Sequence, residues 1–432
     1  MQGIKRKKNL ILATILFAFL NGCSLFRTNE IITEIEINHK NGDFYEDDCI
    51  IEDVAKNESV RIQFAGDIFI HQGPMDVAFQ GDNSFDFKPF FSNISEFIDA
   101  DFAIANMEVP VDARGGNLDV AGWPNFNTPF EILEAVRYAG FHHMITANNH
   151  SFDFGMEGVL NTIGSFERAG LLQTGMSGNL DDFNTSSLVE VNGFKIGIIA
   201  YTDSVNGLEH MVSDESRTYA VRRFYSDNLN SIPFIIDDMK ILRELGADLV
   251  IIALHWGYEY ADSPTDMQKQ IARAISDAGA DIIMGNHSHT VQPIEWHLRY
   301  DGSRALIMYS LGNFLADQTR LTDPTVEAQL YSGFNNNSNS IYIGRTQFGM
   351  LVTLEVTRLS DGEVELGDAH VLPTLAMRDF EGNTLWTKDA VSVMPLINGE
   401  LPAFVEDPEL RRWGNAAYRH VVDIIGREWI AE

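Results

Sequence analysis

The chain of 432 residues carries 62 Asp and Glu residues against 31 Lys and Arg residues, a formal net charge of −31 at pH 7. Such an acidic surface argues against nucleic-acid binding, because that binding depends on basic side chains that contact phosphates. An anionic substrate would have to be bound through metal ions or local positive patches. The length suits one large α/β domain with a tail.

The N-terminus has the features of a bacterial export signal. Four consecutive basic residues, 5–8, precede an apolar run over Leu10–Leu20 that is too short to span a bilayer comfortably. The run ends in Leu-Asn-Gly-Cys, which resembles a lipoprotein lipobox, so we expect residues 1–22 to be a signal peptide and Cys23 to carry lipid. A plain signal peptide with an incidental cysteine is the alternative. With Cys23 lipidated, only Cys49 remains and no internal disulfide framework is expected. The protein is expected to be exported and anchored to the cell membrane.

Residues 23–58 are acidic and aperiodic, so we expect a spacer before a folded domain over 59–375. Beyond the spacer, apolar runs repeatedly end in polar clusters. The predicted strands are Ile62–Ala65, Phe102–Ala105, Met144–Ala147, Leu249–Leu254, Ile282–Met284 and Ala305–Met308. The predicted helices are Pro129–Ala139, Gly158–Ala169, Ile235–Leu245 and Asp266–Ala278. Strands this apolar require a sheet covered by helices, and the carboxyl ends of its strands are expected to form the ligand crevice.

Two long polar segments interrupt this pattern. Residues 203–233 are predicted to form a flap or rim over the crevice, and residues 322–345 an exposed loop. Antiparallel strands are predicted over Met350–Val356, Glu363–Leu366 and His370–Leu372. Residues 376–432 are interpreted as a C-terminal extension with a helix over Pro408–Ile425.

The polar clusters at the strand ends contain residues that bind metal ions. They hold five of the twelve histidines, two carboxylates and one amide: His71, His150, His255, His287, His289, Asp67, Glu108 and Asn149. Oxygen donors combined with imidazoles are typical of a two-metal site, and the lack of cysteine argues against structural zinc. A single histidine at a strand end is more often structural. The joint placement at one sheet edge therefore carries the prediction of two divalent transition-metal ions, for which Mn, Fe and Zn all qualify.

Two of the candidate residues have alternative interpretations. His71 is the weaker ligand candidate, because a four-residue step from Asp67 need not bring both side chains to one ion. Asp153 either accepts a hydrogen bond that orients His150 or caps the helix that follows it. Both interpretations of Asp153 stay open at this point.

Motifs of other reaction classes are absent. The sequence has no Gly-x-Ser-x-Gly elbow, no Gly-x-x-x-x-Gly-Lys-Ser/Thr phosphate loop and no Gly-x-Gly-x-x-Gly after the first strand. A cysteine nucleophile is disfavoured, because Cys49 lies in the spacer.

Six segments together carry a family resemblance. They are Gly66-Asp67, Asn106–Glu108, Asn148–Gly155, His255–Tyr260, Gly285–Gln292 and Ser310–Phe314. In order and spacing they resemble the CapA family of poly-γ-glutamate capsule biosynthesis proteins, which are related to the calcineurin-like metallophosphoesterases. The resemblance implies an α/β fold, a four-layer α/β/β/α sandwich of the metallo-dependent phosphatase type, with C-terminal strands and a terminal helix.

The resemblance also implies roles for the site residues. Glu108 would bridge two metal ions. One ion would be held by Asp67 and His289, and the other by Asn149, His255 and His287. His150 would act as a general acid or transition-state stabiliser while a metal-activated hydroxide attacks phosphorus.

The sequence departs from the related phosphoesterases at several positions. Asp67 lacks the Asp-x-His pattern, which leaves His71 as a substitute ligand, and Glu108 replaces a bridging aspartate. Asn286 and Ser288 stand where relatives commonly have histidine and proline. The leading hypothesis is a membrane-anchored, metal-dependent hydrolase of capsule or cell-envelope polymer biosynthesis. Its expected partners are an anionic polymer, the membrane and a membrane polymer-synthesis complex. The alternatives are a non-enzymatic polymer-binding or export component that keeps the metal site, and a surface phosphatase of other specificity.

Overall fold

The computed structural model describes residues 58–112, 119–181, 188–318, 345–378, 391–406 and 408–431. All of them belong to one unit, Ala55–Glu432. The predicted signal peptide, Cys23, nearly all of the spacer and most of the predicted loop 322–345 lie outside these ranges. Within them, no helix combines the length and the apolar character that a membrane crossing requires.

The first sheet has eight strands built around β1 (Glu58–Phe69). On one side of β1 lie three parallel strands, β4 (Phe102–Met107), β5 (His143–Ile145) and β6 (Leu172–Thr174). On the other side lie three antiparallel strands, β14 (Phe348–Arg358), β15 (Val364–Arg378) and β16 (Val391–Pro395). The short strand β13 (Asn313–Ala316) pairs with the carboxyl end of β1.

The second sheet has six strands, in the order β11-β12-β10-β9-β8-β7. Its four inner strands are parallel: β8 (Phe194–Thr202), β9 (Leu249–His255), β10 (Ile282–Asn286) and β12 (Arg304–Met308). The edge strands β7 (Leu188–Val191) and β11 (Ile294–Leu298) run antiparallel to their neighbours. The inner strands are almost fully apolar, as strands covered on both faces must be.

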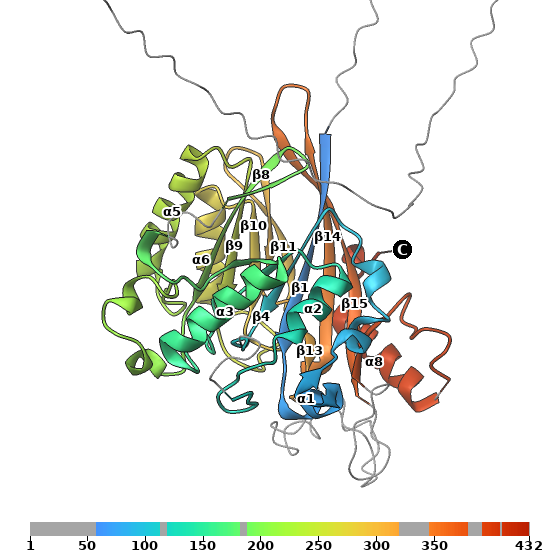
Figure 1. The fold of residues 1–432 in the computed structure, drawn as a ribbon. Helices are drawn as coiled ribbons and strands as arrows, with labels where there is room; N and C mark the ends of the chain where they lie inside the picture. Colours follow the sequence, from blue (N-terminus) through green and yellow to red (C-terminus); the bar gives the residue numbers. More distant parts are fainter. Residues whose placement is uncertain are drawn as a thin grey trace, which may run out of the picture. The chain divides into compact units, whose positions relative to one another are not determined.

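The two sheets pack face to face, and helices cover their outer faces (Figure 1). One buried cluster joins the inner faces, with Ile62 and Phe64 of β1 and Ile251 of β9 among its members. A second cluster lies between the first sheet and the helices α1 (Gln72–Ala78) and α2 (Glu131–Ala139) together with part of α3 (Gly155–Ala169). A third lies between the second sheet and the helices α5 (Ile232–Glu244) and α6 (Asp266–Asp277). The predicted four-layer α/β/β/α sandwich is confirmed.

The C-terminal residues belong to this sandwich. The helix α8 spans Pro408–Ile425, as predicted, and its residues Ala417, Val421 and Ile425 are buried in the cluster between the sheets. The predicted strands 363–366 and 370–372 are one strand, β15, which continues past residue 375. The expected boundary between domain and extension, at residue 375, therefore falls inside β15. Beyond it, β16 continues the same sheet.

Short elements connect the larger ones. The expected flap 203–233 contains three 3-10 turns: η3 (Leu208–Met211), η4 (Ser216–Thr218) and η5 (Leu229–Ser231). The others are β2 (Phe79–Gly81), β3 (Ser84–Phe85), η1 (Lys88–Phe91), η2 (Ser95–Phe97), η6 (Arg345–Gln347) and η7 (Arg427–Trp429).

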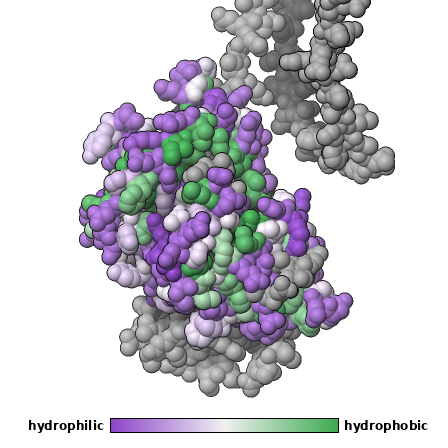
Figure 2. Space-filling model, turned by 60° about the vertical axis from the view of Figure 1, so that its left-hand side comes forward, coloured by the Kyte–Doolittle hydropathy of each residue, from purple (hydrophilic) through white to green (hydrophobic). Residues whose placement is uncertain are grey.

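The surface of this unit is mixed in character. The helix α5, on the left of Figure 1, comes forward in Figure 2, where hydrophobic groups appear among mostly hydrophilic residues. Exposed large hydrophobic residues are Phe234 and Ile241 on α5 and Leu245 directly after it. The candidate ligands described next are, by contrast, all buried.

Candidate metal centre

The carboxyl ends of strands from both sheets deliver the predicted ligands. Asp67 lies near the end of β1 and pairs in register with Asn106 of β4, which Met107 and Glu108 follow. In the second sheet His255, the last residue of β9, lies beside Asn286, the last residue of β10. Since parallel strands end at one edge, the side chains of both sheets meet there.

Asp67 reaches its position because the residue before it, Gly66, has no side chain. A Cβ at Gly66 would lie 1.9 Å from the carbonyl oxygen of Gly312, and the same carbonyl accepts a hydrogen bond of 2.9 Å from the backbone N–H of Asp67. The pairing register of β1 shifts at this point. A glycine is therefore required for β1 to approach the neighbouring chain this closely.

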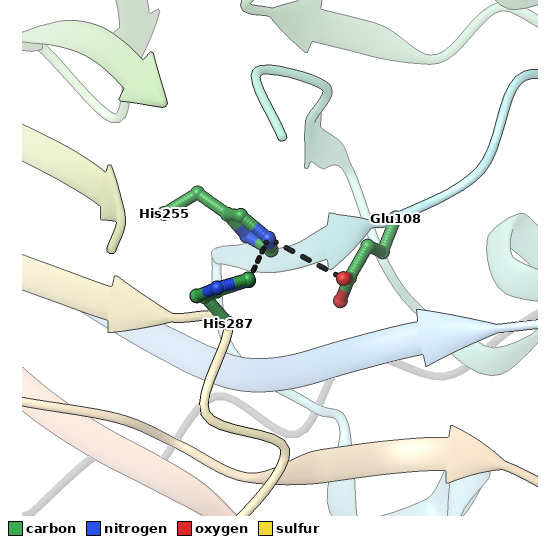
Figure 3. A group of neighbouring side chains, drawn as sticks. All are labelled: Glu108, His255 and His287. Carbon is green, nitrogen blue, oxygen red and sulfur yellow. Dashed lines mark hydrogen bonds and ion pairs between the residues drawn. The ribbon is translucent and has the colours of Figure 1, made fainter. Parts of the chain in front are cut away.

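The first group of potential ligands consists of Glu108, His255 and His287 (Figure 3). The Nε2 atom of His255 lies 3.3 Å from Oε1 of Glu108 and 3.0 Å from Nδ1 of His287. The same Nε2 lies 2.9 Å from Oδ1 of Asn149. The structure thus brings together the residues that the resemblance assigned to one ion.

The second group consists of Asp67, Glu108 and His289. In His289, Nδ1 lies 3.2 Å from Oδ2 of Asp67, and Nε2 lies 3.5 Å from Oε1 of Glu108. Glu108 is common to both groups, and in each group the potential ligand atoms all lie within 4.8 Å of one another. This arrangement fits a bridging position for Glu108. It also fits His287 and His289 as ligands of different ions.

Three of the four oxygens of the two central carboxylates lack a hydrogen-bond donor within the described part of the chain. Neither oxygen of Glu108 nor Oδ2 of Asp67 has a hydrogen-bond partner, and both side chains are fully buried. Burial, and then the nearby Asp67 charge, raise the pKa of the Glu108 carboxyl well above its usual value. Unsatisfied buried carboxylate oxygens are unfavourable unless a cation meets them, so the donor set fits divalent metal ions.

The histidines are in the form that binds metals. Burial, reinforced by the other imidazoles, lowers the pKa of His287 to about 3 and the pKa of His255 well below its usual value. Both rings are therefore neutral near pH 7, and only the neutral imidazole offers a lone pair to a metal.

Two asparagines hold the ligands in place. The Asn106 amide donates a hydrogen bond of 2.8 Å to Oδ1 of Asp67, which leaves Oδ2 directed to His289. Oδ1 of Asn313 lies 3.1 Å from Nδ1 of His289, so this oxygen accepts from an Nδ1–H and leaves Nε2 of the ring for a metal. The motifs containing Asn106 and Asn313 were recognised in the sequence, but their roles were not. Only the structure shows which ligand each one contacts.

His150 is positioned by Asp153. Its Nδ1 lies 2.8 Å from Oδ2 of Asp153, and the same oxygen accepts a hydrogen bond of 2.7 Å from the backbone N–H of Phe126. The N-cap of α3 is Phe154, and no side-chain hydrogen bond caps it. The structure therefore favours Asp153 as the partner of His150 over the capping interpretation.

The structure does not bring His71 to the centre. Its ring lies 4.4 Å from that of Phe69 and 5.3 Å from that of Phe126, and its Nδ1 accepts a weak hydrogen bond of 3.4 Å from the Asp317 backbone. Neither group of potential ligands includes it. Its role as a substitute ligand therefore stays a prediction without support from these groups.

Sequence comparison identifies the family. Residues 61–318 match the model of a family described as "Bacterial capsule synthesis protein PGA_cap". The chain belongs to this family.

Three curated proteins are similar to this chain over part of its length. The chain is 35% identical to "PGA biosynthesis protein CapA" of Bacillus subtilis over 52% of this chain and 56% of that protein. It is 30% identical to "Capsule biosynthesis protein CapA" of Bacillus anthracis, over 62% of this chain and 63% of that protein. It is 24% identical to a "Probable polyglutamine synthesis accessory protein" of Mycobacterium tuberculosis, over 55% and 60% of the two chains. The matches thus span less than two thirds of these relatives.

The loop after β10, which carries His287 and His289, has an unusual backbone. His287 and His289 have φ values of 96° and 56°, in the left-handed region that non-glycine residues seldom adopt. A Cβ at Gly285 would lie 2.0 Å from the carbonyl oxygen of Tyr309, so β10 also runs close to its neighbour here. Backbone conformations of this kind persist where the surrounding structure holds them, as at ligand-binding sites.

A large cavity elsewhere on the molecule shows no comparable chemistry. It has a volume of about 1060 Å³ and lies over β1, β14 and β15, with Arg61, Glu355, Asp368 and Arg427 in its lining. Its lining carries both positive and negative side chains and includes none of the candidate metal ligands. It is therefore a less suitable reaction site than the candidate metal centre.

Proposed function

We propose that this PGA_cap protein acts in capsule or cell-envelope polymer biosynthesis as a metal-dependent hydrolase of phosphoesters. The observation that carries the proposal is the buried carboxylate of Glu108, which belongs to both groups of potential ligands. A carboxylate shared in this way is typical of centres that hold two cations across one reacting phosphoryl group. The names of the relatives support the polymer, and poly-γ-glutamate is the candidate.

The chain supplies the ligands, the orientation and a proton donor. Asp67 and His289 would hold one ion, and Asn149, His255 and His287 the other, with Glu108 between them. Two divalent transition-metal ions such as Mn, Fe or Zn supply Lewis-acid chemistry and activation of a water molecule when bound. Asn106 and Asn313 keep Asp67 and His289 oriented through their hydrogen bonds.

His150 is the candidate general acid. Asp153 occupies its Nδ1, which fixes the ring and leaves Nε2 to carry a proton to the leaving-group oxygen. The 2.8 Å contact with Asp153 keeps the ring in one orientation. Substituting His150 should therefore slow hydrolysis without removing metal.

The net charge of the chain bears on how an anionic polymer would bind. With a formal charge of −31, the surface as a whole repels polyanions, so the cations of the centre would provide the attraction. Export, a lipid on Cys23 and association with a membrane polymer-synthesis complex complete the proposal. A Cys23→Ser variant should leave the membrane fraction for the soluble exported fraction.

Metal content and phosphoesterase activity, measured on one preparation, test the hydrolase. We expect one or two transition-metal ions per chain and turnover of p-nitrophenyl phosphate or its diester. A double variant with His287 and His289 changed to Ala should lose metal and activity, whereas His370→Ala, at an exposed position on β15, should keep both. Bound metal without turnover, together with retained polymer, would favour the non-enzymatic polymer-binding role instead.

A further inference from the structure

The loop between β9 and α6 is tied to the metal centre by its backbone. The N–H of Gly257 donates a hydrogen bond of 3.0 Å to the Asp203 carboxylate at the end of β8. The N–H of Tyr260 donates one of 2.7 Å to the carbonyl of Ser288, between the two histidine ligands. The carbonyl of Ala261 accepts two hydrogen bonds, each 2.7 Å long, from the side chains of Thr290 and Gln292. The position of Tyr260 is therefore fixed relative to the ligands.

The backbone of Tyr260 adopts a conformation that its residue type disfavours. Its φ is 63°, in the left-handed region, which is an outlier for a bulky aromatic residue. Gly or Asn would adopt this conformation more readily. The surrounding hydrogen bonds hold the strained residue, as occurs at ligand-contacting positions.

The side chain of Tyr260 lies next to a predicted ligand. Its ring centroid is 6.1 Å from that of His289, and the ring of Phe69 stacks on the same imidazole at 5.4 Å. The neighbouring Glu259 carboxylate is exposed and acts electrostatically on the phenol. Burial most of all, and then the charges of Glu259 and Glu108, raise the pKa of the Tyr260 phenol. The phenol thus stays protonated at physiological pH and lies within electrostatic reach of the shared carboxylate.

We propose that Tyr260 contacts the substrate, and that its phenol O–H donates a hydrogen bond to a non-bridging oxygen of the phosphoryl group at the metal centre. In the complex the phosphoryl oxygen accepts this hydrogen bond. No proton is transferred. The proposal rests on the proposed function, because it names the chemical group, a phosphate ester or free phosphate, that the centre would receive. A neutral donor suits this position, since it adds attraction for an oxyanion without competing with the cations for their ligands.

A pair of matched variants tests the phenol in the full chain loaded with Mn²⁺. Tyr260→Phe keeps the ring and removes the hydroxyl, and Tyr258→Phe makes the same change two residues away at a side chain that is 69% exposed. We expect Tyr260→Phe to lower kcat/KM for p-nitrophenyl phosphate about 100-fold, as loss of one oxyanion donor does. It should weaken binding of inorganic phosphate, measured calorimetrically, about tenfold. Metal content and the unfolding midpoint should not change, and Tyr258→Phe should behave as wild type.

The phosphate titration separates this proposal from the hydrolase. If the wild type binds phosphate and hydrolyses nothing, the hydrolase is refuted, while a tenfold weaker affinity in Tyr260→Phe still supports the contact. Equal phosphate affinity in Tyr260→Phe and the wild type at equal metal content overturns it, as does absence of phosphate binding by the metal-loaded wild type.

A second variant gives the same answer should Tyr260→Phe fold poorly. Glu259→Gln changes an exposed side chain, removes the negative charge beside the phenol and should tighten phosphate binding severalfold. Unchanged or weaker binding in Glu259→Gln contradicts the placement of the phosphoryl group beside Tyr260.

Discussion

The substitution Glu108→Gln tests two properties of the shared carboxylate: its titration in the metal-free chain and its ability to bind metal. In the metal-free chain Glu108 is buried beside Asp67, and burial raises the pKa of its carboxyl well above 4.5. The folded state therefore keeps a proton that the unfolded state releases above pH 4.5. In the metal-loaded chain the same group must be ionised to bind. Glutamine has nearly the same shape but neither charge nor titration.

The sign and the size of the effect follow from proton linkage. A group whose pKa is raised by folding contributes stability below its unfolded pKa, and that contribution is lost as the pH rises through the folded pKa. One retained proton corresponds to about 1.4 kcal/mol of unfolding free energy per pH unit. His255 and His287 titrate in the wild type and the variant alike, so the difference between the two proteins isolates Glu108. Metal-free Glu108→Gln should therefore gain on the wild type as the pH rises from 4.5 towards the folded pKa of Glu108, by at most about 1.4 kcal/mol per pH unit.

Urea unfolding at a series of pH values above 4.5 measures this difference, once with a chelator and once with excess Mn²⁺. With metal the order should reverse: the wild type should gain about 2.7 kcal/mol at a free ion concentration of 100 times Kd, and the variant much less. Glu190→Gln, an exposed carboxylate on β7, is the control and should show neither effect. The reasoning is refuted if the metal-free variant is less stable than the wild type throughout, or if both gain equally from metal.

Three further predictions concern the site and the elements that carry it. Asp153→Asn should lower kcat about 10- to 100-fold at unchanged metal content, because it misorients His150; a kcat within twofold of wild type in steady-state assays would exclude that role. Gly66→Ala should destabilise the fold by at least about 2 kcal/mol in urea unfolding, since its Cβ would meet a carbonyl oxygen at 1.9 Å, whereas Gly164→Ala, in open space on α3, should stabilise by about 0.5–1 kcal/mol. Metal affinity should rise with pH and binding should release a proton from Glu108; calorimetry in buffers of different ionisation enthalpy would detect a null release that contradicts this.

The layers of the fold and the edge that holds the site could be predicted from the sequence for a simple physical reason. Apolar runs that end abruptly in Asp, Asn or His mark buried parallel strands, and such strands all end at one edge of a sheet. Asp67, Glu108, His255 and His287 therefore meet although they lie up to 220 positions apart. Their assignment to metal ions stays a prediction, because geometry shows only that they could hold them.

The errors arose where local pattern does not determine distance or pairing. The strand β8 was not predicted: its apolar run leads to Thr202 and Asp203, with no cluster of potential ligands to draw attention to it. β15 was predicted as two strands because Gly367 and Asp368 interrupt the pattern. In the structure a register shift opposite Glu355 accommodates them within one strand.

If two ions bind as proposed, the sharing of Glu108 would couple the two metal positions thermodynamically. The ion that binds first would displace the proton, so the second would meet a carboxylate that is already ionised. The linkage is reciprocal: occupancy of either position changes the affinity of the other by the same factor, with the shared proton favouring joint occupancy and the repulsion between cations opposing it. A centre of this design responds to metal supply as one cooperative unit, and its midpoint shifts with pH.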